Sequence, residues 1–145
     1  MELTVKHFSE LTADELFMIY KLRTAVFVVE QKCPYQEVDD ADRQSYHVWL
    51  HESGEIQAYL RIVPENVLSE NVSIGRVIAV KRRCGLGTQI LNAGIKIAKD
   101  CLGADTVVVE AQTYAKKLYE NVGFVRISDE FLEDGIPHIK MRLDI

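Results

Sequence analysis

The stretch that decides the fold is Arg82-Arg83-Cys84-Gly85-Leu86-Gly87-Thr88, which separates two apolar segments of different periodicity. Residues 72–80 before it are rich in β-branched side chains, a pattern that predicts a strand. After it, apolar residues recur every three to four positions as far as Leu102, and Gly103 follows, which predicts a helix with a glycine just past its end. A glycine loop between a strand and a helix brings free backbone N–H groups to the positive end of a helix dipole. The sequence therefore predicts an anion site at this loop.

The spacing of the loop residues narrows the class of anion. A Walker A loop needs a lysine between its last glycine and the following Ser or Thr, and here Thr88 follows Gly87 directly. A dinucleotide-binding fingerprint needs a third glycine where Ile90 stands. What remains is the pattern Arg82-x-x-Gly85-x-Gly87, which by itself is also compatible with a tight turn into a packed helix.

Length and composition indicate a single domain over residues 1–145. The net charge of −5 argues against a nucleic-acid-binding face, and no apolar run approaches the length of a membrane span. The three cysteines form no Cys-x-x-Cys pair, the four histidines have no zinc-site spacing, and the N-terminus lacks the pattern of a secretory signal. We expect a cytoplasmic protein with no metal and no nucleic-acid or membrane partner, and both a monomer and a homodimer remain open.

Hydrophobic periodicity and turn residues divide the chain into strands and helices. Strands are expected at residues 3–8, 46–51, 56–63, 72–80, 106–111, 123–127 and 138–143. Helices are expected from a Ser9 or Thr12 cap to about residue 28, from the glycine loop to Leu102, and over residues 115–121, with a loop and about one helical turn at residues 30–43.

The order of these elements is β-α-(short α)-β-β-β-α-β-α-β-β. It predicts an α+β fold with a mixed, mostly antiparallel sheet of about seven strands and helices on both faces. The three strands within residues 46–80 form an antiparallel meander, and the glycine loop lies in a parallel crossover.

Three further segments are similar to a known family. Residues 22–39 and 133–141 resemble signature segments of the ElaA-type branch of the Gcn5-related N-acetyltransferases (GNATs). Residues 118–124 resemble the superfamily's Tyr-x-x-x-Gly-Phe segment, and the glycine loop is similar to the one with which GNATs hold the pyrophosphate of acetyl-CoA. The resemblance covers essentially the whole chain, and it implies the GNAT fold.

The resemblance also implies that acetyl-CoA is the co-substrate. Gly85 and Gly87 would let the backbone approach the pyrophosphate, and the backbone of residues 78–80 would pair with the pantetheine arm. A backbone N–H near Ala79 or Val80 would polarise the thioester carbonyl. The residues implied in cofactor binding are Ile78, Ala79, Val80, Arg82, Arg83, Gly85, Leu86, Gly87, Thr88, Gln112 and Tyr119.

One departure from the family pattern concerns the link between Val80 and Arg82, which is shorter than usual. It leaves open whether Arg82 or Arg83 supplies the first phosphate contact. A solvated basic pair is the alternative for both side chains.

Two catalytic residues are predicted. Tyr119 is the candidate proton donor to the departing CoA thiolate, because a phenol is protonated at neutral pH, and the alternative is a packing tyrosine. The base that removes a proton from the amine is sought among Glu30, Glu110, Glu133 and His138. We select His138 because it titrates near neutrality, and the alternative is a strand-end histidine without a catalytic task.

The predicted acceptor-binding residues are Arg23, Phe27, Glu30, Asp39 and Arg61. The alternative for the two arginines is that they pair with carboxylates of the acidic loop. If the acidic segment 37–42 borders the acceptor, it would favour a cationic small primary amine or a lysine-like group, and the alternative is a solvated acidic loop.

The function implied by the resemblance is an acyl-CoA-dependent N-acetyltransferase that transfers the acetyl group directly within a ternary complex. One alternative is a non-catalytic module that binds acyl-CoA or a regulatory partner. Another is an enzyme similar to acyl-homoserine-lactone synthases, which use S-adenosylmethionine and an acylated carrier protein, although this chain has Cys33-Pro34-Tyr35 where that family has a tryptophan.

Overall fold

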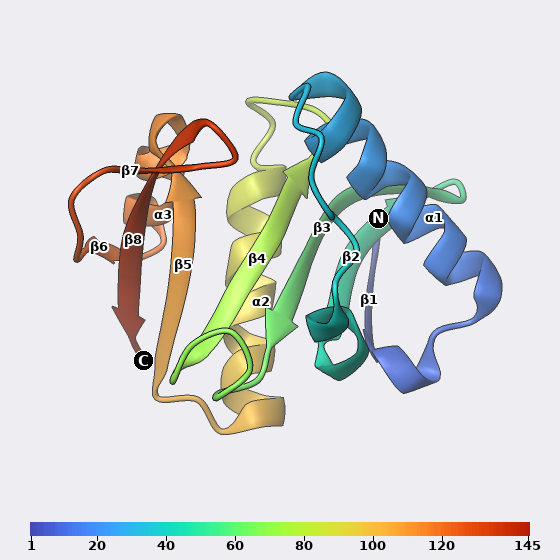
Figure 1. Ribbon diagram of the computed structural model, residues 1–145. Coiled ribbons are helices and arrows are strands. Elements are labelled where there is room, and N and C mark those ends of the chain that lie inside the picture. Colours follow the sequence, from blue (N-terminus) through green and yellow to red (C-terminus); the bar gives the residue numbers. More distant parts are fainter.

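A single eight-stranded sheet runs through the whole molecule (Figure 1). The computed structural model describes all 145 residues. The strands lie in the order β1-β2-β3-β4-β5-β8-β6, with β7 also paired to β8, and every neighbouring pair is antiparallel except β4–β5. The strands are β1 Glu2–His7, β2 Tyr46–Glu52, β3 Glu55–Val63, β4 Val72–Ala79, β5 Thr106–Gln112, β6 Val125–Arg126, β7 Phe131–Glu133 and β8 Ile136–Asp144.

Helices cover both faces of this sheet, with α1 on one face and α2 on the other (Figure 1). They are α1 Ala13–Arg23, a π-helix Thr24–Glu30, α2 Leu86–Leu102 and α3 Lys116–Asn121, with short 3-10 helices at Phe8–Glu10, Asp40–Gln44 and Thr113–Ala115. None of these helices combines the length and the apolar character that a membrane span needs. The α+β class and the mixed sheet are confirmed.

Local sequence signals explain where α1 and α2 begin and end. Thr12 caps α1, because its hydroxyl accepts from the N–H of Glu15 while the Glu15 carboxylate accepts from the N–H of Thr12, at 3.1 and 2.9 Å. Gly103 ends α2 in the left-handed conformation, at φ 62°. Both features agree with the sequence prediction.

The main core lies between the sheet and α2, where 18 buried residues form one cluster. Gly94 of α2 sits against Leu60 of β3, and a Cβ at this glycine would lie 2.8 Å from a Leu60 methyl. The absence of a side chain at residue 94 therefore permits the close approach of α2 to the sheet. A second cluster of five buried residues lies on the opposite face, beneath α1.

The parallel strands β4 and β5 separate along their length (Figure 1). They pair only at Val72 with Val107 and at Ser73 with Val108. We call the rest of the two strands, residues 74–79 and 109–112, the β4–β5 divergence. The pairing of β3 with β4 shifts register between Tyr59 and Arg61, and Arg76 adopts a positive φ of 55°, so β4 carries a bulge within the divergence.

Three boundaries differ from the sequence prediction. The helix expected to reach about residue 28 ends as α-helix at Arg23 and continues as the π-helix, where β-branched valines are frequent and disfavour tight helical turns. The strand expected at 123–127 pairs only over Val125–Arg126. The prediction missed β7, although Asp134-Gly135, at φ 51° and 75°, is a typical signal for the two-residue hairpin turn that joins β7 to β8.

We predict that Gly94→Val lowers the free energy of unfolding by about 2 kcal/mol, because the added methyls overlap the buried Leu60 side chain. Urea unfolding would measure this. Asn92→Val, on the exposed face of the same helix, introduces the same side chain without the overlap and should change stability by less than about 0.5 kcal/mol. Equal stability of the two variants would contradict the packing argument.

Candidate active site

The glycine loop joins β4 to α2, and its two glycines meet different requirements. Gly85 lies at the N-terminus of α2 with φ 78°, a left-handed conformation, and a Cβ there would meet no atom within 4 Å. Gly87 has ordinary φ, but its Cβ would lie 3.1 Å from Leu118 of α3. Gly85 is thus needed for the backbone turn, and Gly87 for the packing of α3 against the start of α2.

This loop presents free hydrogen-bond donors. No backbone N–H group from Arg82 to Thr88 donates a hydrogen bond within the chain. The Arg82 and Arg83 side chains are exposed and form no ion pair, whereas Leu86 is buried in the main core and anchors the loop. Free N–H groups, two unpaired cations and the positive end of a 17-residue helix together fit an anion such as a pyrophosphate.

The edge of β4 that faces β5 continues this surface. Ile78 and Ala79 pair with Tyr59 and Ala58 of β3, but they have no partner on the β5 side. An unpaired strand edge can accept an extended ligand arm. The N–H of Val80 donates to the carbonyl of Gln57 at 2.9 Å, so it is not free to polarise a thioester, and this part of the sequence prediction is corrected.

Tyr119 lies on α3 and is 8% exposed. Its ring packs edge-to-face on Phe124, with the centroids 5.9 Å apart. Burial raises the pKa of its phenol well above the ordinary value, so the group stays protonated, and its hydroxyl forms no hydrogen bond within the chain. Both the packing role and the proton-donor role are compatible with this position, so the catalytic role stays a prediction.

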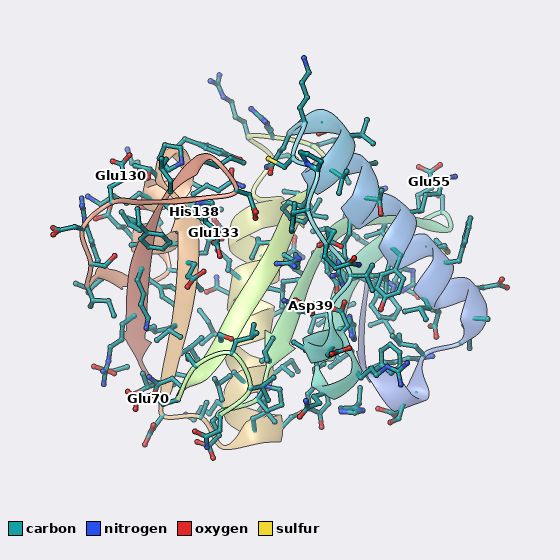
Figure 2. The ribbon with its side chains drawn as sticks, viewed as in Figure 1. Asp39, Glu55, Glu70, Glu130, Glu133 and His138 are labelled. Carbon is teal, nitrogen blue, oxygen red and sulfur yellow. The ribbon has the colours of Figure 1, made fainter.

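Three of the four candidate bases lie together at the β5 side of the divergence. Figure 2 shows His138 and Glu133 next to each other, and His138 Nε2 lies 3.8 Å from the Glu133 carboxylate. The Nδ1–H of His138 donates to the carbonyl of Ile136 at 2.7 Å, which leaves Nε2 as the acceptor nitrogen of the neutral ring. Glu110, on β5, lies near enough to Glu133 to raise the pKa of its carboxyl. Glu30 is exposed at the end of the π-helix and forms no contact with this group.

The environment of Glu133 favours its neutral form. Burial first, and then the neighbouring Glu110, raise the pKa of the Glu133 carboxyl above its ordinary value. Neither carboxylate has a lysine or arginine nitrogen within 4.0 Å. A carboxyl group with a raised pKa is a stronger base than an ordinary glutamate, so Glu133 is a candidate proton acceptor.

Two contacts hold the segment after the π-helix against the wide end of the divergence. The amides of Gln31 and Gln112 donate to each other at 3.4 and 3.3 Å, although 81 positions separate them in sequence. Cys33 Sγ lies 3.5 Å from the carbonyl of Asp134, in the turn between β7 and β8. Gln112, predicted to bind the cofactor, is therefore engaged with Gln31 in this structure.

The predicted acceptor-binding arginines lie in a buried ion network beneath α1. Arg23 is 0% exposed and donates to Asp42 at 2.7 and 3.1 Å and to Glu37 at 3.0 Å. Arg61 is 2% exposed and donates to Asp39 at 2.6 and 3.0 Å and to Asp42 at 3.0 Å. We call this group, with Arg76, the Arg23–Asp42 network.

The network also includes Arg76 and is extended by the side chains of His47 and Tyr59. Arg76, at the β4 bulge, donates to the Glu37 carboxylate and to its carbonyl, and its guanidinium lies over the Tyr35 ring. His47 donates from Nε2 to the carbonyl of Asp42 at 3.0 Å, so its Nδ1 accepts the Tyr59 hydroxyl proton at 2.6 Å. Burial lowers the pKa of His47, which agrees with a neutral ring.

Three of the four acids of segment 37–42 are therefore neutralised within the chain, and the fourth, Asp40, is exposed and forms no ion pair. Burial alone would raise the pKa of Asp42, but hydrogen bonds and charge from Arg23 and Arg61 hold it below its ordinary value. Glu37, Asp39 and Asp42 are each paired with arginine, so most of the negative charge of the segment is held in ion pairs. The structure thus supports the pairing alternative for Arg23 and Arg61, and attraction of a cationic acceptor by this segment stays a prediction.

The remaining predicted residues lie elsewhere, and some network members were missed. Phe27 packs against the small core under α1, and acceptor contact by Phe27 or Glu30 stays a prediction. Sequence reasoning did not identify Arg76, His47 or Tyr59; the signal for Arg76 was an arginine within an apolar strand.

A cavity of about 220 Å³ lies between α1 and β1–β3, lined by Trp49 and six other residues, none of them from the glycine loop or the divergence.

Comparison with known proteins agrees with this geometry. The family model described as "Acetyltransferase (GNAT) domain" matches residues 8–145. UPF0039 protein C11D3.02c of Schizosaccharomyces pombe is 42% identical and covers 100% of this chain and 98% of its own length. The crystal structure of Escherichia coli ElaA is similar with a TM-score of 0.92 at 34% identity, and that of a Pseudomonas aeruginosa acyl-CoA N-acyltransferase with 0.90 at 40%, each over 99% of both chains.

We predict that Arg23→Met lowers the free energy of unfolding by about 3–5 kcal/mol, because it leaves Glu37 and Asp42 buried without their shared cation. Urea unfolding at pH 7 would measure the change. Lys96→Met removes an exposed ion pair with Asp100 and should leave the stability nearly unchanged. If the two variants were equally stable, the network would not be what holds α1 to the sheet.

Proposed function

This chain belongs to the GNAT acetyltransferase family, and from that premise we propose that it transfers an acetyl group from acetyl-CoA to a primary amine. One observation carries the proposal. The unpaired edge of β4 leads directly into a loop whose backbone N–H groups from Arg82 to Thr88 have no acceptor within the chain. This arrangement supplies donors for a pyrophosphate and a strand edge for an extended arm in one continuous surface.

The chemistry required of the protein is modest. The loop and the β4 edge hold the thioester beside the divergence, and the amine approaches from the side of β5 and of the segment after the π-helix. Holding both reactants together replaces a bimolecular encounter by a unimolecular step. The C–N bond forms, the C–S bond breaks, and the thiolate takes up a proton, for which the protonated phenol of Tyr119 is the candidate donor.

Enzyme assays would distinguish acetyl transfer from two other functions. A module that only binds acyl-CoA would show affinity without transfer, and a lactone-synthase-like enzyme would require S-adenosylmethionine and an acylated carrier protein. The titratable group formed by Glu110, Glu133 and His138 supports an enzyme, because binding alone makes no use of a proton acceptor.

Calorimetric titration with CoA tests whether the protein binds this cofactor. Two glycines at opposite ends of α2 provide a test variant and its matched control. Both Gly85 and Gly103 have positive φ and open space around the Cβ position, so alanine strains the backbone similarly at each. We predict that Gly85→Ala weakens CoA binding at least ~10-fold, because the loop must shift, while Gly103→Ala leaves the affinity unchanged. Absence of saturable heat with the unaltered protein at millimolar CoA would rule out the cofactor claim.

Tyr119→Phe separates catalysis from binding. The ring and its contact with Phe124 are retained, so we predict unchanged CoA affinity and a turnover reduced by about 10²-fold or more. Thiol release from acetyl-CoA, with spermidine, L-lysine and a lysine-containing peptide as acceptors, provides the assay. Tyr114→Phe, at a tyrosine that is 74% exposed, is the control and should behave as the unaltered protein. Undiminished turnover of Tyr119→Phe would assign this residue to packing alone.

A further inference from the structure

The carboxylates of Glu110 and Glu133 stand apart from the other acids near the divergence, because no arginine or lysine neutralises them. The acids of the Arg23–Asp42 network are all paired with guanidinium groups. The Glu133 carboxylate instead lies 3.8 Å from Nε2 of His138, with Glu110 of β5 as its neighbouring acid. Figure 2 shows that Glu133 and His138 lie on one side of β4 and Asp39 on the other. Negative charge that is free to act on a ligand is therefore on the β5 side.

We propose that Glu133, paired with Glu110, removes the proton from the incoming ammonium group of a cationic primary amine, and that His138 passes this proton to solvent. The inference rests on the proposed acetyl transfer and names the proton acceptor and the charge class of its substrate.

The topology directs these side chains to the divergence. Val109 and Ala111 of β5 point into the main core, so Glu110 between them points to the opposite face of the sheet. Glu110 lies two residues beyond the last β4–β5 pair, opposite Lys140 of β8. The β7–β8 hairpin brings Glu133 to the same face, and the contact of Cys33 with the Asp134 carbonyl fixes the hairpin turn.

The charged groups that face Glu133 are few. Glu110 approaches it from β5, His138 from β8, and Asp134 from its own hairpin, while no ion pair joins Lys140 to either glutamate. The negative charge of the neighbouring Glu110 disfavours ionisation of Glu133, so Glu133 retains its proton to a higher pH than an isolated glutamate would. An ammonium group that enters beside them supplies the missing positive charge, and this favours a cationic acceptor over a neutral or anionic one.

The proton balance of the step closes without a further reactant. The doubly ionised pair takes one proton from R–NH₃⁺, which gives R–NH₂ and a singly protonated pair. The nitrogen lone pair attacks the thioester carbon, the C–N bond forms, and the C–S bond breaks with its electrons on sulfur. The second nitrogen proton is lost as sulfur gains one, so the products are the amide, the CoA thiol and one proton. That proton leaves through Nε2 of His138, because Nδ1 is held by the carbonyl of Ile136.

The pH dependence of kcat/KM for the amine, at saturating acetyl-CoA, tests the assignment with spermidine, L-lysine and a lysine-containing peptide. Glu133→Gln removes the proton acceptor, and we predict a loss of at least 100-fold with unchanged CoA affinity. Glu110→Gln removes the repelling charge, so the pKa of Glu133 falls and the acidic limb of the profile moves to lower pH. Glu130→Gln, in the same exposed region but outside the group, is the matched control and should reproduce the original profile.

A titration of ¹³C-labelled glutamate carboxyls gives a readout that does not depend on turnover. In the unaltered protein the Glu133 signal should titrate at a higher pH than the Glu130 signal, and in Glu110→Gln it should move to lower pH. If transfer occurs but Glu133→Gln keeps both rate and profile, the proton-acceptor assignment is overturned while the proposed function stands. If the unaltered protein transfers acetyl to none of these amines, both fail.

Discussion

The pairing of Arg23 with Asp42 is the interaction on which the α1 side of the structure depends. Both side chains are almost fully buried, and a buried charge without its partner is strongly destabilising. Arg23 lies at the end of α1, Asp42 in the loop before β2, and Arg61 on β3, so their contacts fix a helix, a loop and the sheet relative to one another. Through Glu37 the same network reaches Arg76, and hence the bulge of β4 within the divergence.

This network also divides the charges around the divergence into two groups. On the α1 side the acids serve structure, because arginines neutralise them and burial removes them from solvent. On the β5 side Glu110 and Glu133 have no such partners, and the Glu133 carboxylate lies 3.8 Å from Nε2 of His138. The same residue type is thus neutralised on one side of the divergence and left without a cationic partner on the other, and the difference lies in which arginines reach it.

Much of the fold and part of the site could be predicted from the sequence. The glycine loop between a β-branched strand and a helix of regular periodicity, the Thr12 cap and the Gly103 terminus are local patterns, and the structure has each where expected. The parallel pairing of β4 with β5 followed from the order of the elements. The π-helix and β7 were not foreseen, because an apolar, valine-rich run is compatible with several helical geometries and because a three-residue strand carries almost no periodicity.

The sequence by itself determined the order of strands and helices and the position of the glycine loop, because turns, caps and periodicity are set by residues a few positions apart. Only the tertiary structure decided what the charged residues do. It placed Arg23 and Arg61 in buried ion pairs and left Glu133 beside Glu110, and it joined Gln31 to Gln112 across 81 positions. The role of an ionisable group depends on its burial and on the charges around it, and both arise from segments distant in sequence.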